Sequence, residues 1–223
     1  MPLQATSGAA SYDAFGGGVP VVPNYIEDVF SCFVYTGTSA ARDIVNGIDL
    51  AGKGGLAWIK CRTVAESNSL FTTNLGANKT LLTDATDAQD TVGTDVFQSF
   101  NSDGFRVGSH GRTNESPRTY ASWTFRKQPK FFDVVTYTGN GSAPRNISHN
   151  LGSVPGCIMI KRTDSTGTWT VYHAGIGNTK AIFLNATATT DTNSAYWNNT
   201  TPTSTVFTPV SYTHLTLPTK RIV

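Results

Sequence analysis

The sequence is poor in residues that build helices, with 3 Glu and 2 Met among its 223 residues. Charged residues make up 14% of the chain, well below the roughly 25% of an average soluble domain. With so few good helix formers, the composition disfavours a helical bundle. No apolar run approaches the roughly 20 residues needed to cross a bilayer, so we expect no membrane insertion.

A strong charge of either sign is also missing. The formal net charge is +2, and Lys and Arg are scattered along the chain, so it lacks the basic patch of a nucleic-acid-binding protein. Cys32, Cys61 and Cys157 lie far apart in the sequence. Zinc sites need Cys and His pairs at short intervals, so we expect three buried or half-buried thiols and no metal site of this kind.

What the chain has in abundance is β-branched and turn-forming residues: 33 Thr, 18 Ser, 15 Asn and 21 Gly. This composition favours short strands joined by polar turns. Apolar runs and turn signals alternate every 8–12 residues, for example around the hairpin sequence NSDG at 101–104, and this spacing is typical of a sandwich or jelly roll. The sequence therefore predicts an all-β fold of antiparallel β-sandwich units.

An internal repeat runs through the chain. The motif VYTG at 34–37 returns as TYTG at 136–139, and LAWIK at 56–60 returns as CIMIK at 157–161. RT at 62–63 returns at 162–163, so the offset stays at 100 to 102 residues. Three matches in the same order indicate a tandem duplication of a unit about 100 residues long.

The repeat and the composition divide the chain into four parts. Residues 1–27 are rich in Gly, Ala and Pro and are expected to be a linker or extended arm. Residues 28–130 form the first β-sandwich unit. Residues 131–209 form a second, truncated unit, in which 132–137, 157–161, 168–173 and 181–185 are predicted strands. Two arrangements stay open: the units pack side by side, or their sheets merge into one larger jelly roll.

The last part, residues 210–223, has the sequence VSYTHLTLPTKRIV. Its first ten residues resemble a translated sequencing adapter, so we expect an artefactual tail that adds no stability and at most continues the strand at 205–208 as an edge strand. The alternative is a natural β-strand. In the first case, the second unit lacks a counterpart of the aromatic strand TYASWTF at 119–125.

The second unit carries a resemblance to a known group of proteins. The runs FFDVVTYTGNGSAPRNISHNLGSVPGCIMIKRT, TWTVYHAGIGNTKAIFLN and YWNNTTPTSTVFT resemble a repeat domain of virion structural proteins of tailed phages, found especially in marine sequences. This resemblance implies a concanavalin A-like, lectin-type β-sandwich in a tail-fibre-like protein of the virion. Host-surface glycans or other virion proteins would be its partners, and fibre proteins of this kind are typically homotrimers.

Residues for catalysis are scarce. A glycosidase needs two carboxylates flanking one sugar bond, yet Glu27, Glu66 and Glu115 lie far apart in the sequence. No Gly-x-Ser-x-Gly elbow and no phosphate-binding glycine loop occurs. We therefore expect a protein that is not an enzyme and needs no cofactor.

One acidic cluster stands out, formed by Asp84, Asp87 and Asp90 with Asp95 close by. Carboxylate oxygens in a loop are ligands that calcium prefers. The spacing differs from that of an EF-hand, so a solvated loop is the alternative to a calcium site.

Aromatic residues of the second unit are the candidate ligand contacts. A sugar ring stacks its apolar face on Trp or Tyr, while Asn and His side chains bond its hydroxyls. This chemistry points to Trp197, Asn198, Asn199, Tyr172 and His173. The alternative is that Trp197, like Trp169, fills the core. Three functions remain open: a glycan-binding module, an architectural spacer or subunit contact, and a virion-associated glycan depolymerase.

Overall fold

The computed structural model describes residues 25–141, 144–209 and 220–222. The all-β prediction is confirmed, since helix makes up 6% and strand 38% of the chain. The described helices are single turns: η1 (Ile26–Asp28), α2 (Leu50–Lys53) and η2 (Ser194–Trp197). Most of the predicted arm, residues 1–24, lies outside the described residues.

The first half of the chain forms two antiparallel sheets that face each other. One sheet has the strand order β1-β9-β3-β4-β5-β6, and the other has the order β2-β8-β7. Their bounds are β1 (Phe30–Thr36), β2 (Arg42–Val45), β3 (Gly55–Cys61), β4 (Ser69–Thr72), β5 (Lys79–Leu82), β6 (Asp90–Thr91), β7 (Phe97–Asn101), β8 (Gly104–Val107) and β9 (Thr119–Arg126). The predicted hairpin at 101–104 joins β7 and β8.

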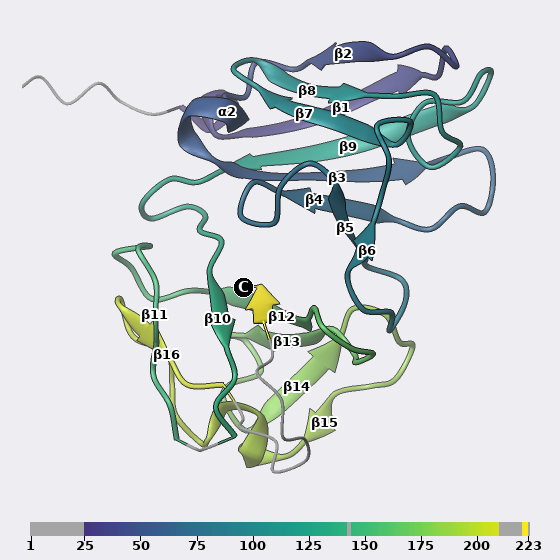
Figure 1. Cartoon of the computed structure of the whole chain (residues 1–223). Helices are drawn as coiled ribbons and strands as arrows, with labels where there is room; N and C mark the ends of the chain where they lie inside the picture. The colour runs from purple at the N-terminus through teal and green to yellow at the C-terminus, as the bar shows by residue number, and fades with distance from the viewer. Residues whose placement is uncertain (1–24, 142–143, 210–219, 223) are drawn as a thin grey trace, which may run out of the picture.

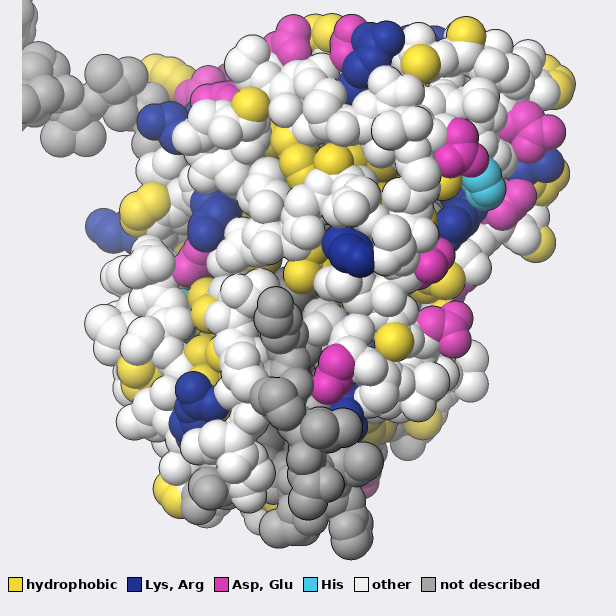
Figure 2. Space-filling view, viewed as in Figure 1, with side chains coloured by type: hydrophobic (Ala, Val, Ile, Leu, Met, Phe, Trp, Pro, Cys, Tyr) yellow, Lys and Arg dark blue, Asp and Glu magenta, His cyan; other side chains and the backbone are white. Residues whose placement is uncertain are grey.

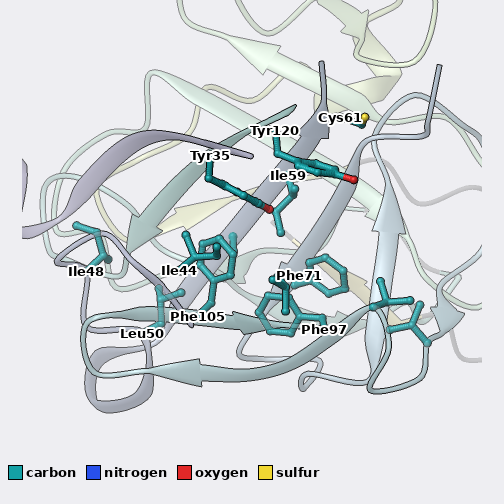
Figure 3. Packing of buried hydrophobic residues seen from close by; sticks show 14 residues of the cluster. Tyr35, Ile44, Ile48, Leu50, Ile59, Cys61, Phe71, Phe97, Phe105 and Tyr120 are labelled. Atoms are coloured by element: carbon teal, nitrogen blue, oxygen red, sulfur yellow. The ribbon is translucent and has the colours of Figure 1, made fainter. Parts of the chain in front are cut away.

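Alternation along the strands builds the core between these sheets. In β3, Ile59 points toward the three-stranded sheet, whereas its neighbour Trp58 points to the opposite face. Figure 3 shows Ile59 in one buried cluster with the rings of Phe71, Phe97 and Phe105. Phe71 and Phe97 stack with ring centroids 4.2 Å apart. This arrangement is consistent with a β-sandwich.

The second half repeats this order of strands. Its larger sheet has the order β10-β17-β12-β13-β14-β15, which matches the first sheet strand for strand, and β11 pairs with β16. The bounds are β10 (Thr136–Thr138), β11 (Ile147–Ser148), β12 (Cys157–Arg162), β13 (Thr170–His173), β14 (Lys180–Phe183), β15 (Asp191–Thr192), β16 (Val206–Phe207) and β17 (Lys220–Ile222). The strand predicted at 132–137 begins only at Thr136, because Val134 is buried between the two halves.

The two halves meet through the outer faces of their six-stranded sheets (Figure 1). Leu56, Leu70 and Leu81 of the first half form one buried cluster with Val134 and Trp169 of the second. The indole Nε1 of Trp169 also donates to the Leu82 carbonyl across the junction, at 2.8 Å. The two sheets therefore remain separate and do not merge, and the two halves pack side by side.

The backbone of β17 takes the place in the second sheet that β9 takes in the first. It pairs with β10 on one side and with β12 on the other. Residues 220–222 thus lie inside a sheet, not on its edge as expected, and they do not simply continue β16. Residues 210–219 lie outside the described residues, so the artefactual origin of the tail stays a prediction.

Candidate functional site

An aromatic groove opens on the outer face of the first six-stranded sheet. Five residues line it, and its volume is about 290 Å³. We call these residues the aromatic groove: Trp58, Lys60, Asn68, Trp123 and Phe125.

The groove is built by strand register. Trp58 of β3 lies directly opposite Trp123 of β9, and their rings are 5.8 Å apart and tilted by 59°. Cross-strand aromatic pairs of this kind stabilise a sheet. Both rings are only partly buried, because the second half covers only part of this face, so the pair also offers a surface for a ligand.

Two polar atoms at the groove have no hydrogen-bond partner among the described residues: the indole Nε1 of Trp58 and the amide Oδ1 of Asn68. One is a donor and the other an acceptor. Buried polar atoms are nearly always bonded to protein, water or ligand. The Lys60 ammonium, by contrast, donates to the Glu66 carbonyl at 2.6 Å. The residues that line the groove thus offer aromatic surface together with one buried donor and one buried acceptor that have no partner among the described residues.

A second cavity, of about 110 Å³, lies at the junction of the halves. Its walls are mostly apolar, and three titratable side chains line it. One is Cys157, which like Cys32 is a free, exposed thiol and not, as expected, a buried or half-buried one. The other two are already engaged. Asp133 pairs with Lys127 at 3.2 Å, and His149 Nδ1 accepts from the Leu151 N–H at 3.2 Å. This cavity has little with which to recognise a polar ligand, and we assign it to the packing of the two halves.

Trp197 and Tyr172 were predicted to contact a ligand, but the structure buries both rings. Their exposed fractions are 1% and 3%, and both belong to the core of the second half. The rings meet edge to face at 5.4 Å, and Trp197 Nε1 donates to the Lys180 carbonyl. No ring face is left for a sugar, so the core interpretation of Trp197 is correct, as it is for Trp169.

The other predicted contacts lie outside this core. Asn198 and Asn199 both have positive φ, 48° and 51°, a conformation that Asn tolerates better than most residues. The Asn198 amide donates to the Pro209 carbonyl, which gives it a structural role. His173 is exposed, and its Nδ1 accepts from the Gly175 N–H at 3.1 Å. A ligand role for Asn199 and His173 stays a prediction.

The three candidate calcium ligands do not converge. Asp84 accepts from the Asn68 N–H at 3.1 Å, Asp90 is 3.8 Å from Arg112, and Asp87 faces Lys161. In the described part of the chain, no three His, Cys, Asp or Glu side chains group as metal ligands. The structure therefore offers no support for a calcium site at these aspartates.

Two of the three glutamates come together, against the expectation from their sequence separation. Arg118 lies 2.6 Å from Glu66 and 3.0 Å from Glu115. The hydrogen bond to Glu66 raises the pKa of Arg118. A glycosidase acid must carry a proton, whereas both carboxylates here accept from one guanidinium. Their arrangement is that of an ion-paired clamp between two loops.

The surface chemistry elsewhere is mixed. Figure 2 shows basic and acidic side chains interspersed over the face that it presents, with no large area of one sign. No helix in the described ranges is long and apolar enough to span a membrane. The aromatic groove is therefore the feature with the clearest capacity to bind a ligand.

Sequence reasoning missed the groove because its residues are far apart in the chain. One signal was present: Trp58 lies in the repeated motif at 56–60, and Trp123 in the aromatic strand at 119–125. The 101-residue offset between β3–β4 and β12–β13 aligns Trp58 with Met159 and Asn68 with Trp169. The second half therefore has Met159 in β12 where the first half has Trp58. Its counterpart of Asn68 is Trp169, which packs in the junction between the halves.

These observations define an all-β protein with two similarly ordered six-stranded sheets and an aromatic groove on one of them. Residues 26–222, from η1 to β17, match a family described as a domain of unknown function (DUF7483), and the chain belongs to this family. No curated protein and no solved structure matches the chain.

Proposed function

We propose that the chain is a glycan-binding module of a virion structural protein of a tailed phage, and that the aromatic groove is its binding site. The resemblance of the second unit to phage repeat domains supports the virion setting. The groove itself carries the proposal of binding, because its lining residues include a partly exposed pair of tryptophans, an unpartnered donor and an unpartnered acceptor. The expected partner is a host-surface glycan outside the bacterial cell.

The chemistry of a sugar suits this groove. Its apolar face stacks on Trp123, while its hydroxyls, which both donate and accept, can bond to Trp58 Nε1 and Asn68 Oδ1. The volume of about 290 Å³ is near the lower end of the range of small-molecule sites. One or two sugar rings of a longer glycan would occupy it.

The matching strand orders support a finer proposal for the fold, two tandem units of the jelly-roll or concanavalin A-like type. In both, a backbone N–H before the β4-like strand donates to an Asx side chain after the β5-like strand. Asn68 bonds Asp84, and Trp169 bonds Asn185. Shared local bonds at one offset are expected of duplicated units.

A glycan array probed with the full chain, followed by titration of the best ligand, tests the proposal. Trp123→Ala and Asn68→Ala should each abolish or strongly weaken binding without unfolding the protein. Tyr25→Ala, which removes an exposed aromatic ring outside the groove, is the matched control and should bind normally. Binding that survives Trp123→Ala would place the site elsewhere, with His173 and Asn199 as the next residues to change.

The second candidate function is an architectural spacer or subunit contact. The junction favours this function, because the outer faces of both six-stranded sheets contribute residues to one buried apolar cluster. This junction makes the chain a rigid connector. A lack of binding to every glycan on a broad array, together with assembly into larger particles, would favour this function. The depolymerase alternative gains nothing from the carboxylates, which are paired with Arg118.

A further inference from the structure

Among the residues that the structure describes, strand β1 is an edge strand without the protection that edges normally carry. It ends the first six-stranded sheet and pairs with β9 on one side. It is seven residues long, FSCFVYT, with no charge and no proline. Val34 and Phe33 on it are exposed to 59% and 36%. Natural proteins usually block such an edge with a charge, a proline, a bulge or a very short strand.

Every other edge strand that the structure describes has one of these devices. β2 carries Arg42 and Asp43, and β7 contains a register shift between Phe97 and Ser99. β10 has three residues, and β6, β15, β11 and β16 have two each. Among the described edge strands, β1 alone lacks all of these features, which favours its pairing with another strand.

The free side of β1 can be read from its hydrogen bonds. Two backbone hydrogen bonds lie just beyond the two ends of the strand. Arg126 N donates to the Val29 carbonyl, and Gly37 N donates to the Arg118 carbonyl. In an antiparallel ladder only every second residue bonds a given neighbour. The odd-numbered residues therefore bond β9, and the even-numbered ones, such as Cys32 and Val34, direct their N–H and C=O groups to the free edge.

We infer that β1 pairs with β1 of a second copy of this chain, antiparallel about a two-fold axis at Phe33. An antiparallel strand can pair with itself, as a two-fold interface requires. This register places Cys32 opposite Val34 of the second copy as a hydrogen-bonded pair, and it uses all seven residues. Shifting the axis to Cys32 or to Val34 leaves the strand ends unpaired.

The side chains fit this register. On one face the two Phe33 rings meet at the axis as a non-hydrogen-bonded pair, where strands approach most closely. On the other face, Cys32 packs on Val34, and no charged groups oppose each other. The two six-stranded sheets become one continuous sheet, and the aromatic grooves remain open on it. The inference does not depend on glycan binding.

Measuring the self-association of the full chain tests the inferred interface. We expect analytical ultracentrifugation to show a concentration-dependent species at twice the chain mass of 23.9 kDa. Val34→Lys should raise the dimer Kd severalfold, because it replaces the apolar Val34–Cys32 cross-strand contacts, two per dimer, by charges of the same sign on the paired edge. Val45→Lys, at an equally exposed valine (57%) of the edge strand β2, should leave the Kd unchanged. A monomer at all concentrations, or equal effects of the two variants, would overturn the inference.

Disulfide trapping tests the register. In a background of Cys32→Ser and Cys157→Ser, Phe33→Cys should crosslink two chains under mild oxidation, because a non-hydrogen-bonded pair has the short Cα separation that a disulfide needs. Val34→Cys in the same background is the control and should not crosslink, since it faces Ser at position 32 of the second copy. Crosslinking of the control alone, or a trimeric mass, would contradict the two-fold register.

Discussion

Lys161 is a fully buried cation at the junction of the two halves, and its titration should be visible in the stability of the protein. The side chain has 0% exposure. Its ammonium donates to the carbonyls of Thr86, at 3.2 Å, and of Arg162, at 2.9 Å. Burial lowers the pKa of Lys161 to about 8, from an ordinary value of 10.5, and the charge of Asp87 offsets only part of this effect.

The direction of the pH dependence follows from this lowered pKa. Between about pH 8 and pH 10.5 the unfolded chain holds a proton that the folded chain has released, so the free energy of unfolding rises with pH. The gain is complete above the unfolded pKa and is lost as the pH falls through about 8. For a shift of this size it amounts to about 2 kcal/mol between about pH 7 and about pH 9.5.

The variant Lys161→Met isolates this effect. Urea unfolding of both proteins at several pH values gives the difference in free energy, in which the titration of all other groups cancels. We expect wild type to gain about 2 kcal/mol relative to Lys161→Met over that range. At neutral pH the variant should be at least as stable, because Thr86 O keeps its bond from Gly167 N and a buried cation is removed.

The matched control is Lys60→Met, at the corresponding position of the first half, where the side chain is only partly buried. This variant removes a lysine from the equivalent strand position without removing a fully buried cation. A flat difference curve for Lys161→Met between about pH 7 and about pH 9.5 would refute the reasoning, since it would mean that Lys161 reaches solvent in the folded protein.

Two further predictions concern other buried groups. Trp169→Ala should lower the free energy of unfolding by about 3–5 kcal/mol, because the ring fills the junction cluster and bonds Leu82, whereas Leu184→Ala, at an exposed position, should cost far less in the same denaturation assay. Burial raises the pKa of Tyr120 to about 12, so the unfolded chain ionises first and stability should fall above about pH 10. Tyr120→Phe should remove about 1.4 kcal/mol of that loss by about pH 11; an unchanged alkaline limb in pH-dependent unfolding would contradict this.

The sequence was sufficient for the fold class, because alternation and turn chemistry are local signals. The predicted strands at 157–161 and 168–173 correspond to β12 and β13. The strand predicted at 132–137 was too long, since Val134 is apolar for a different reason: it belongs to the junction between the halves. An apolar residue in a sequence does not say which of two cores it enters.

The candidate site was less predictable for the same physical reason. Trp197 next to two Asn residues has the composition of a sugar site, yet its ring is in the core and Asn198 forms the turn beside it. Trp58 and Trp123 lie 65 residues apart, and only the β3–β9 register places them together. Pairing between distant strands is set by the whole sheet and is not encoded near either residue.

Differences between the two similarly ordered halves explain why the first one holds the groove. Both six-stranded sheets have an outer face, and one such face must cover the other if apolar area is to be buried. The second half uses Trp169 and Met159 for this contact, at the positions where the first half has Asn68 and Trp58. Because the covering is partial, Trp123 keeps an accessible ring while Leu56 and Leu70 are sealed. The junction therefore leaves the aromatic groove to residues of the first half alone. Its cluster contains no residue of β1, so this edge stays available for the pairing that we infer.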